Sequence, residues 1–411
     1  MRAGELLAES HLRSCTEKHT KNIGPSRPHL LKEMNARQLL ALLRANNPCS
    51  RADLVRLSGL SAPTVSSTID HLERKQLVSR LGPGSSNGGR RPDMIAFNPS
   101  RGVVAGVDLG GSTVRLAVAD LDGKIQGRWS VSTRGNKTPE KIVELIHSGL
   151  QKILHQAEIP KEKLLALGLG APGITDVDAG IVVTAPNLSG WQNVPLRDLL
   201  ESKLRTPAVV ENDVNVGAIG EHWVGSARGI ANFVFLAIGT GIGAGIFING
   251  HLYHGSTCAA GEVGYLIVPG AQLPHIDGDK PGALENTIGG KAIERKWREM
   301  CEESSHASLR ATEIFELAAQ GQSQARQLLD SSAQILAYAI TNIALLLNTS
   351  LIVLGGSVGT SEPLLRATRG ILERNDFARP QLAISHLGPD AQLHGAIRLA
   401  LDRVEASILL S

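Results

Sequence analysis

Residues 103–119 read VVAGVDLGGSTVRLAVA, and the expected fold of the larger part of the chain follows from this stretch. Residues 103–108 are an apolar run that ends in an aspartate, which predicts a buried strand. The loop DLGGST follows, and residues 114–119 predict a second strand that ends at an Asp122-Gly123 turn. In such a hairpin, bare glycine backbone and hydroxyl groups can lie against a phosphate. Because DxGG also serves as an ordinary hairpin turn, this loop alone does not specify a ligand.

A second glycine-rich segment has a similar setting downstream. An apolar strand at 233–238 precedes GTGIGAG (residues 239–245), and another strand is expected at 246–248. Four glycines alternating over seven residues leave enough bare backbone for a polyphosphate. A third apolar strand, 351–354, ends in a Gly-Gly-Ser turn (residues 355–357), where an adenosine could sit. None of these segments has the P-loop or Rossmann spacing, so those two nucleotide-binding folds are not expected.

A carboxylate stands between the two glycine-rich segments. The sequence VVENDVN (residues 209–215) places Asp213 just beyond a buried strand. A carboxylate there can act as a general base toward a substrate hydroxyl in phosphoryl transfer. The alternative is that Asn212 or Asp213 simply caps the helix that follows, and the segment taken alone favours that alternative.

Taken together, these segments resemble the ROK family (repressors, open reading frames and sugar kinases), whose fold is the actin-like or hexokinase-like ATPase fold. The likeness runs from about Gly102 to the C-terminus. It implies a two-lobed α/β body over residues 99–411, with a ligand cleft between the lobes and a C-terminal helix near 391–405 that returns to the first lobe. Further matching segments are Gly170-Ala171-Pro172-Gly173, Pro186-Asn187-Leu188 with Trp191, and Gly261-Glu262-Val263-Gly264.

The resemblance also implies roles for individual residues. ATP phosphates and adenosine would be bound by the three glycine-rich segments, through Asp108, Gly110, Gly111, Ser112, Thr113, Gly239, Thr240, Gly241, Gly243, Gly355 and Gly356. Sugar hydroxyls need hydrogen-bond acceptors, and a site built to hold them rejects sugars that lack them. The implied sugar ligands are Asn212, Asp213, Glu262, Tyr265 and Glu285, with Asp213 as the catalytic base of a kinase.

Two departures from the family pattern bear on cofactors. The family's Gly-Glu-x-Gly-His motif reads Gly-Glu-Val-Gly-Tyr here, so Tyr265 stands where a histidine normally contacts both sugar and zinc. The cysteine-rich zinc loop is also missing, and only GALE (residues 282–285) remains of its end. Structural zinc needs about four ligands and this stretch has no thiolate, so no structural zinc is expected. The nearby His275, Asp277 and Asp279 predict a solvated loop rather than a cation site. Mg-ATP is expected only if kinase activity is retained.

The front of the chain differs from the body in charge. Residues 32–101 hold 11 Lys and Arg against 5 Asp and Glu, a net charge of +6. Residues 102–411 hold 26 against 31, a net charge of −5, and residues 1–31 have a net charge of +2. A basic module on a mildly acidic body indicates that the front binds a polyanion. Chance clustering of charge on a solvated face is the alternative.

The pattern inside residues 31–98 predicts a winged helix-turn-helix, preceded by a flexible tail at 1–30. A helical stripe of leucines from Asn35 ends at Pro48, and Ser50 then caps a short helix with Asp53 in a capping box. A Ser-Gly-Leu turn separates that helix from a third one, which Ser61 caps and which runs to about Lys75. A strand at 77–81, a glycine-rich tip at 82–89 and a returning strand at 94–97 predict the wing.

DNA contacts are expected from the outward side chains of the third helix and from arginines beside the wing tip. A winged helix used only for protein contacts is the alternative. The predicted DNA-binding residues are Ser61, Pro63, Thr64, Ser66, Ser67, His71, Arg80, Arg90 and Arg91.

Composition limits the class of protein. Of the 411 residues, 42% are hydrophobic and 20% are charged, which excludes disorder as the main state. The four cysteines have no CxxC spacing, so no disulfide framework is expected. The same pattern predicts that the protein works in a reducing compartment. Residues 1–30 have no apolar signal-peptide core, and the apolar stretch 343–354 is too short to span a bilayer. The sequence therefore predicts a cytoplasmic protein without a membrane partner.

These observations predict a sugar-responsive DNA-binding regulator of transcription, a repressor of carbohydrate-metabolism genes that is similar to the xylose- and N-acetylglucosamine-type branch of the family. Operator DNA and a sugar or sugar phosphate are the expected partners. A homodimer or homotetramer is expected, because two winged helices on two half-sites multiply affinity. One alternative is an ATP-dependent, glucokinase-like sugar kinase with a DNA-binding domain. Another is a body that docks a protein partner such as a sugar-transport component, which no residue here specifically supports.

Overall fold

The computed structural model divides the chain into two units. The first unit comprises the residues up to Gly102 together with Val404–Ser411, and the second comprises Val103–Arg403. Most of the expected tail at 1–30 and of the wing tip at 82–89 lies outside the described residues. The described residues are 28–84, 91–133, 137–185, 188, 190–269, 280–301, 308–377 and 379–410.

The first unit has the predicted winged helix-turn-helix fold. Its first described helix begins at Pro28, seven residues before the start that the leucine stripe indicated. Ser50 and Asp53 form the predicted capping box, and Gly59 takes a φ of 70° in the turn before the helix that Ser61 caps. A positive φ there suits glycine, which has no Cβ to clash. The elements are α2 (Pro28–Ala45), β1 (Cys49–Ser50), α3 (Arg51–Ser58), α4 (Ala62–Arg74), β2 (Val78–Pro83) and β3 (Asp93–Phe97).

The body contains two five-stranded sheets with the same strand order. In each sheet the third, second, first, fourth and fifth strands along the chain lie side by side, giving β6-β5-β4-β7-β11 and β14-β13-β12-β15-β16. The first sheet is built from β4 (Val103–Leu109), β5 (Thr113–Asp120), β6 (Ile125–Ser132), β7 (Leu164–Ala171) and β11 (Ala208–Asn212). The second is built from β12 (Phe233–Ile238), β13 (Ile242–Ile248), β14 (His251–Leu252), β15 (Leu351–Gly355) and β16 (Gln381–Ile384).

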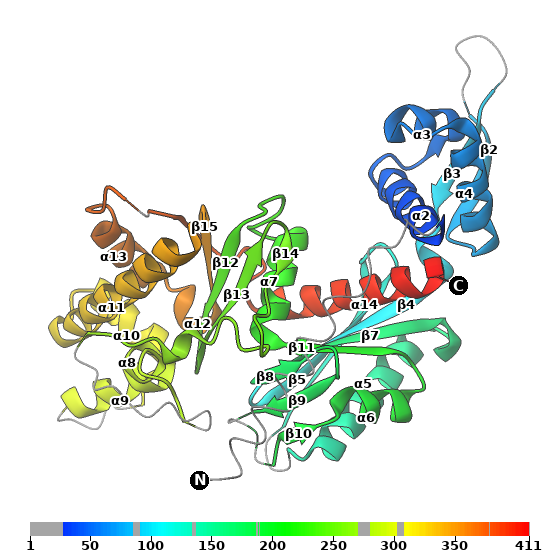
Figure 1. The fold of residues 1–411 in the computed structure, drawn as a ribbon. Coiled ribbons are helices and arrows are strands. Elements are labelled where there is room, and N and C mark those ends of the chain that lie inside the picture. Colours follow the sequence, from blue (N-terminus) through cyan, green and yellow to red (C-terminus); the bar gives the residue numbers. More distant parts are fainter. Residues whose placement is uncertain are drawn as a thin grey trace, which may run out of the picture. The chain divides into compact units, whose positions relative to one another are not determined.

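Helices cover both faces of the two sheets (Figure 1). In the first lobe, α5 (Pro139–Gln156) and α6 (Leu196–Leu204) bury one face of the sheet, and a small sheet of β8 (Ile174–Asp176), β9 (Ile181–Thr184) and β10 (Gln192–Val194) adds to that core. In the second lobe a group of helices buries one face of the sheet. They are α8 (Glu285–Ile288), α9 (Gly290–Met300), α10 (Ala311–Ala319), α11 (Ser323–Leu347), α12 (Gly356–Gly359) and α13 (Glu362–Leu372).

The second glycine-rich loop is shorter than the sequence suggested. Strand β13 begins at Ile242, so the expected seven-residue loop is reduced to residues 239–241. A Cβ on Gly243 would lie 3.0 Å from Val214, and one on Gly245 would lie 2.4 Å from the Cβ of Ala218. These two glycines therefore lie in a strand and give room to a helix, which alternation in sequence cannot distinguish from a bare loop.

That helix, α7 (Asp213–Val224), packs against α14 (Ala391–Leu410) with almost no space between the two backbones. A Cβ on Gly395 of α14 would lie 1.7 Å from the carbonyl oxygen of Val216. Helix α14 also lies along the first sheet, where a Cβ on Gly168 of β7 would lie 2.1 Å from the carbonyl oxygen of Ala396. The C-terminal helix thus lies on the first lobe, opposite α5, since residue 168 and its neighbours in β7 face opposite ways.

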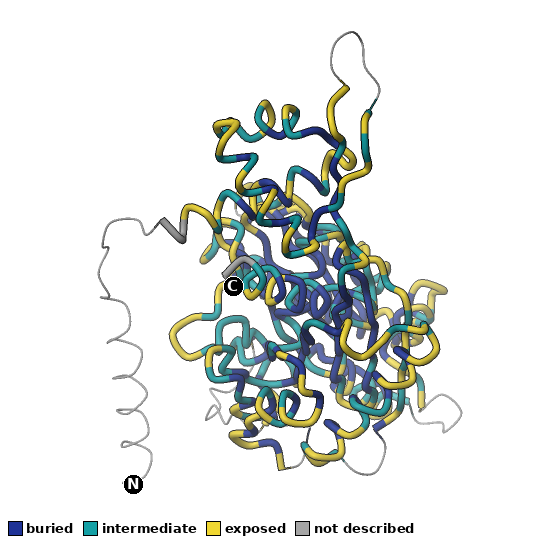
Figure 2. Tube along the Cα trace, turned by 90° about the vertical axis from the view of Figure 1, so that its right-hand side faces the viewer, coloured by how far each residue is buried: buried dark blue, intermediate teal, exposed yellow. Residues whose placement is uncertain are grey.

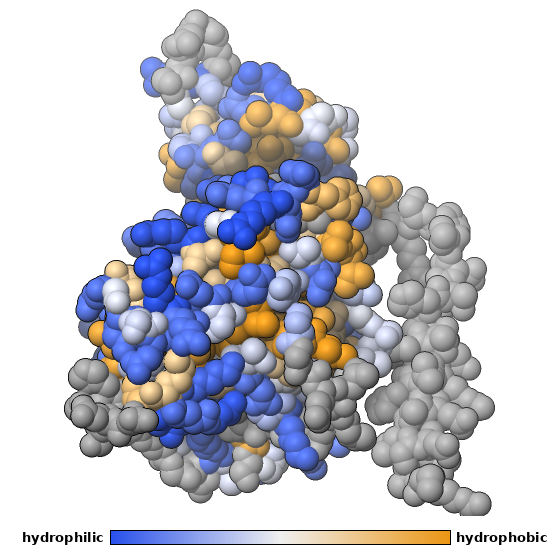
Figure 3. Space-filling view, turned by 90° about the vertical axis from the view of Figure 1, so that its left-hand side faces the viewer, coloured by the Kyte–Doolittle hydropathy of each residue, from blue (hydrophilic) through white to orange (hydrophobic). Residues whose placement is uncertain are grey.

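Burial follows this layering. The strands of both sheets are mostly buried, while the helices have exposed outer faces (Figure 2). Hydrophilic side chains cover much of the face drawn in Figure 3, with apolar side chains gathered between them. Among the described helices, α11 alone is long and apolar enough by composition to cross a membrane, and 56% of its most apolar window is buried inside the protein.

Candidate functional sites

The ends of parallel strands in the first sheet bring two of the predicted residues together. Strands β4, β7 and β11 run parallel, so Asp108 near the end of β4 and Asn212 at the end of β11 share one edge of the sheet. Carboxyl ends of parallel strands are the usual place for a ligand in an open α/β sheet. Asp213 follows at the first position of α7, close enough to Asp108 for the two charges to interact.

The acidity of Asp213 is strongly perturbed. Burial, together with the neighbouring charges of Asp108 and Glu262, raises the pKa of its carboxyl to about 7, against a hydrogen bond from the Val214 N–H that lowers it. A group that titrates near neutral pH can accept a proton from a hydroxyl and later release it. The geometry therefore gives Asp213 the acidity that a general base needs.

Asn212 caps α7, as the alternative interpretation of the sequence anticipated. Its Oδ1 accepts hydrogen bonds from the N–H groups of Val214 (2.9 Å) and Asn215 (3.0 Å), and its Nδ2 donates to the carbonyl oxygen of Gly173 (2.8 Å). Both acceptor positions of the amide oxygen are thereby used. A sugar hydroxyl at Asn212 would meet the amide nitrogen.

The second lobe contributes two more carboxylates. Glu262 precedes a short 3-10 turn, and the pKa of its carboxyl is raised, first by burial and then by the charge of Glu285. Glu285 begins α8, and its Oε2 accepts a hydrogen bond from the backbone N–H of Ile242 at 2.9 Å. The pairwise influences among Asp108, Asp213, Glu262 and Glu285 show that the structure brings these four predicted residues into one acidic cluster.

Tyr265 lies on the segment that leads away from this cluster. Its hydroxyl donates a hydrogen bond to the carbonyl oxygen of Lys280 at 3.0 Å. The N–H of Leu284 bonds to the carbonyl oxygen of Leu266 at 3.1 Å, so the two segments on either side of residues 270–279 are joined by protein contacts. His275, Asp277 and Asp279 lie outside the described residues. Within the described residues, no group of three or more His, Cys, Asp or Glu side chains could hold a metal ion.

The first glycine loop is more open than the other two glycine-rich segments. A Cβ on Gly111 would meet nothing within 4 Å, and one on Gly110 only the carbonyl oxygen of Thr113, whose own backbone closes the hairpin. Ser112 is exposed, and Thr113 is partly exposed. Packing therefore does not require glycine at Gly111, where the bare backbone leaves room for a phosphate.

The other two glycine segments are more constrained. Gly239 has open space around it and Thr240 is exposed, but a Cβ on Gly241 would lie 3.0 Å from the Glu285 carboxylate. At the end of β15, a Cβ on Gly355 would lie 2.4 Å from the Phe235 ring, and Gly356 has a φ of 75°. Glycine at these last two positions is explained by packing and backbone conformation.

Two cations near the first loop were missed by the sequence analysis. Arg115, which pairs with Asp108 across β4 and β5, places its Nη2 2.6 Å from the Asp108 carboxylate. Lys137 places its Nζ 2.5 Å from the carbonyl oxygen of Gly111, and the Trp191 indole donates to the main-chain oxygen of Lys137 at 2.6 Å. The antiparallel register could have indicated Arg115, but no local signal points to Lys137.

The predicted DNA-binding residues in and beside α4 are exposed or partly exposed. Val65, Ile69 and Leu72 are buried, so the opposite side of the helix faces outward. Ser61, Pro63 and Ser67 are exposed, while Thr64, Ser66 and His71 are partly exposed.

Hydrogen bonds and ion pairs engage some of the predicted DNA-binding residues within the winged helix. Arg51 of α3 donates to Ser66 at 2.6 Å and to Asp70 at 2.6 Å, tying the two helices of the motif together. Arg80 of the wing makes two hydrogen bonds of 2.9 Å to Glu73. Arg91 is exposed, and Arg90 lies outside the described residues. Burial lowers the pKa of His71, and the nearby Lys75, Arg74 and Lys32 lower it further.

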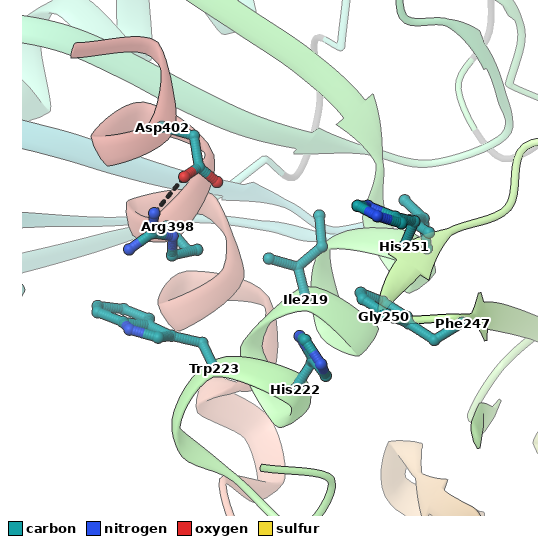
Figure 4. Close-up of a pocket in the computed structure, with 9 residues that line it drawn as sticks. Ile219, His222, Trp223, Phe247, Gly250, His251, Arg398 and Asp402 are labelled. Atoms are coloured by element: carbon teal, nitrogen blue, oxygen red, sulfur yellow. Dashed lines mark hydrogen bonds and ion pairs between the residues drawn. The ribbon is translucent and has the colours of Figure 1, made fainter. Parts of the chain in front are cut away.

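A separate hollow of about 430 Å³ is lined in part by the C-terminal half of α7 (Figure 4). Trp223 and His222 of α7 face it together with the β13–β14 turn and Arg398 of α14, whose guanidinium lies 5.8 Å from the Trp223 ring and pairs with Asp402. None of the predicted site residues lines this hollow, so it is distinct from the acidic cluster.

Comparison with known proteins gives matches to both units. The profile of the ROK family matches residues 104–403, and the profile of the MarR family matches residues 31–91. The xylose repressor of Bacillus subtilis is 30% identical over 382 residues, covering 90% of this chain and 96% of the relative. The glucokinase of Halalkalibacterium halodurans is 34% identical over 308 residues, covering 71% of this chain and 92% of the relative.

A solved structure matches the fold of nearly the whole chain. It is a ROK family transcriptional regulator, a homologue of the Escherichia coli MLC protein, with a TM-score of 0.78 and 20% sequence identity over 92% of this chain and 99% of that one. At this identity the likeness shows the fold alone.

Proposed function

Since the chain belongs to the ROK family, we propose that it is a sugar-responsive, DNA-binding repressor of carbohydrate-metabolism genes. The observation that carries the proposal is the presence, in one chain, of a winged helix with an exposed polar helix face and a cluster of carboxylates suited to hydroxyl groups. The xylose repressor relative covers 90% of this chain, whereas the glucokinase relative covers 71% of it.

The winged helix supports binding to operator DNA. Helix α4 is the second helix of the motif, which is the one that enters the major groove in proteins of this kind. Its exposed Ser61, Pro63 and Ser67 are small enough for close approach to base edges or phosphates. We expect two such winged helices in a homodimer or homotetramer, in the cytoplasm, where the operator is accessible.

The acidic cluster supports binding of a sugar. Asp213, Glu262 and Glu285 offer carboxylate oxygens, which accept hydrogen bonds from hydroxyl groups. Asn212 can donate one more hydrogen bond from its amide nitrogen. We further propose that the Glu285 segment is ordered by contacts such as Tyr265 to Lys280 and needs no structural zinc.

The regulatory step is a shift between two populations of the protein. A sugar that binds one arrangement of the lobes more tightly moves the equilibrium toward it by no more than that difference in affinity, which is typically about 1–3 kcal/mol. The DNA affinity then changes by roughly 5–150-fold.

The test is a DNA-release experiment on the full chain. Operator fragments are first selected from random DNA with the purified protein, and binding is then followed by fluorescence anisotropy in the presence of D-xylose, D-glucose and other sugars. We expect at least one sugar to weaken DNA binding, and Asp213→Asn to bind the same DNA without responding to that sugar. A protein that selects no DNA, or whose DNA binding no sugar changes, would contradict the proposal.

Sugar kinase activity is a second candidate, favoured by one observation. The Asp213 carboxyl has a pKa of about 7, so it can act as a base near neutral pH. Mg-ATP would then be the cofactor, bound at the open loop of Gly110 and Gly111. A coupled ADP-release assay with Mg-ATP and the same sugars, run in parallel on Asp213→Ala, decides the question. Turnover that the variant lacks would make the protein a kinase as well, and no turnover would leave the cleft as a sensor.

A further inference from the structure

A buried carboxylate that the proposed function does not use lies directly before the sugar-binding residues. Glu211 is the penultimate residue of β11, and only 2% of it is exposed. Its Oε1 accepts hydrogen bonds from the backbone N–H of Asn212 (2.8 Å) and from Nδ2 of Asn215 (3.0 Å). Its Oε2 lies 2.7 Å from Nε2 of His254. A buried charge needs such partners, because removing it from water without them is costly.

His254 comes from the other lobe. It follows β14 of the second sheet, whereas Glu211 belongs to the first sheet, so the ion pair links the two lobes of the body. The carbonyl oxygen of His254 accepts a hydrogen bond from Ala260 at 3.1 Å, and the carbonyl oxygen of Gly261 accepts one from Ala244 at 2.8 Å. The chain anchored in this way continues directly into Glu262.

One carboxylate therefore links the two segments that carry Asp213 and Glu262. On one side, Glu211 is bonded to the backbone that leads into Asp213, and on the other, through His254, to the segment that ends in Glu262. We propose that Glu211 and His254 are a positioning pair that sets the separation of the Asp213 and Glu262 side chains and thereby the affinity of the cleft for its sugar. This inference rests on the proposed sugar-binding function.

The charges around His254 determine how the pair responds to pH. Glu211 faces it from β11, and Asp178 faces it from the turn after β8; Cys258, on the same segment as His254, lies near both acids. The hydrogen bond to Glu211 raises the pKa of the His254 imidazole, and the charges of Glu211 and Asp178 raise it further against burial. The cation therefore persists above the ordinary range of histidine and is lost as the pH rises through the raised pKa.

A comparison of two substitutions at His254 separates positioning from ordinary packing. His254→Arg keeps a cation that does not titrate, and His254→Gln keeps an N–H donor without the charge. Affinities for D-xylose and D-glucose are measured by calorimetry from about pH 6 to about pH 9 for both variants and the wild type. Asp213 titrates in all three proteins, so the ratio of wild-type to His254→Arg affinity isolates the imidazole.

The two variants should differ from the wild type at opposite ends of the pH range. Wild-type sugar affinity should fall by about tenfold relative to His254→Arg toward the alkaline end and match it at the acidic end. His254→Gln should bind about tenfold more weakly than the wild type at acidic pH and equally at alkaline pH. A constant wild-type to His254→Arg ratio, or a His254→Gln protein that binds like the wild type throughout, would overturn the proposal.

A measurement without sugar keeps the inference testable if neither sugar binds. Amide hydrogen exchange is compared over residues 254–264 and over the winged helix in the wild type, His254→Gln and Glu211→Gln. Both variants should exchange faster in 254–264 and unchanged in the winged helix, because only the linkage between the lobes is weakened. If the wild type binds neither sugar and the variants nevertheless show this difference in exchange, the result would count against the proposed effectors and not against the pair. Unchanged exchange in 254–264 in both variants would refute the pair.

Discussion

The acidic residues of the winged helix and those of the cleft have opposite electrostatic surroundings. In the winged helix, the Arg80 guanidinium beside Glu73 lowers the pKa of that carboxyl, and hydrogen bonds from Ser50 lower the pKa of Asp53. In the cleft, burial and neighbouring negative charges raise the pKa values of Asp213 and Glu262. The charged form of a carboxyl group is therefore favoured in the winged helix and disfavoured in the acidic cluster.

This difference indicates that the acidic cluster lowers the stability of the protein when no ligand is bound. Carboxylates that are crowded together and desolvated cost stability in the empty protein, and a ligand that brings hydrogen-bond donors relieves that cost. Carboxylates paired with arginine on an exposed surface contribute little stability either way. Of the three substitutions that follow, the first tests the packing behind the first sheet, and the other two test this contrast between carboxylates.

The largest expected effect comes from replacing the glycine at which strand β7 of the first sheet packs against α14. In Gly168→Val, the new side chain would clash with the carbonyl oxygen of Ala396, which an added Cβ would already approach to 2.1 Å. We expect a loss of about 3 kcal/mol of stability or more, measured by urea unfolding. Gly111→Ala, at an open position, is the control and should change stability by less than about 1 kcal/mol. Equal stabilities of the two variants would contradict the packing described for α14.

Asp213→Asn should stabilise the protein while it abolishes the response to sugar. The pKa of this carboxyl is raised in the folded state, from 3.8 to about 7, so the folded protein binds more protons in that interval and loses stability as the pH rises through it. The neutral amide avoids this loss, which we put at roughly 2 kcal/mol because the side chain is partly exposed. Urea midpoints at about pH 4 and about pH 8 should therefore agree at the lower pH and differ at the higher one. A variant less stable than the wild type at pH 8 would show that the ionised Asp213 carboxylate does not destabilise the folded protein.

The smallest effect on stability, with the opposite dependence on pH, is expected in the winged helix. The pKa of Glu73 is lowered by Arg80, so the carboxylate contributes stability above its ordinary pKa, and this contribution is lost as the pH falls through the lowered value. Glu73→Gln should be slightly less stable than the wild type near pH 7 and equal to it in strong acid.

The same variant should also bind DNA more tightly. With Glu73 neutral, Arg80 is available to a phosphate, so we expect about a twofold to fivefold gain in affinity at low salt and a steeper salt dependence. The control is Arg80→Ala, which should weaken binding and reduce the salt slope by about one. If both variants bind DNA like the wild type, the wing arginine takes no part in the complex.

Local sequence was sufficient for most of the winged helix. The capping box at Ser50 and Asp53, the glycine turn and the cap at Ser61 depend on residues within a few positions of one another, so the pattern predicted them correctly. The beginning of the first helix was misplaced because Pro28 and the residues after it do not continue the leucine stripe. In the body, the strands that lead into and out of the first glycine loop were also predicted, since continuous apolar runs mark buried strands.

The sequence by itself determined which residue types are present and what short segments do: a winged helix, buried strands, and acids placed just after them. Only the tertiary structure decided which glycines are open and which give room to a helix, because Gly111 and Gly243 look alike in sequence and differ in what lies beside them. It also decided that Glu211 meets His254. Contacts of this kind depend on how distant segments fold together, and no local pattern specifies them.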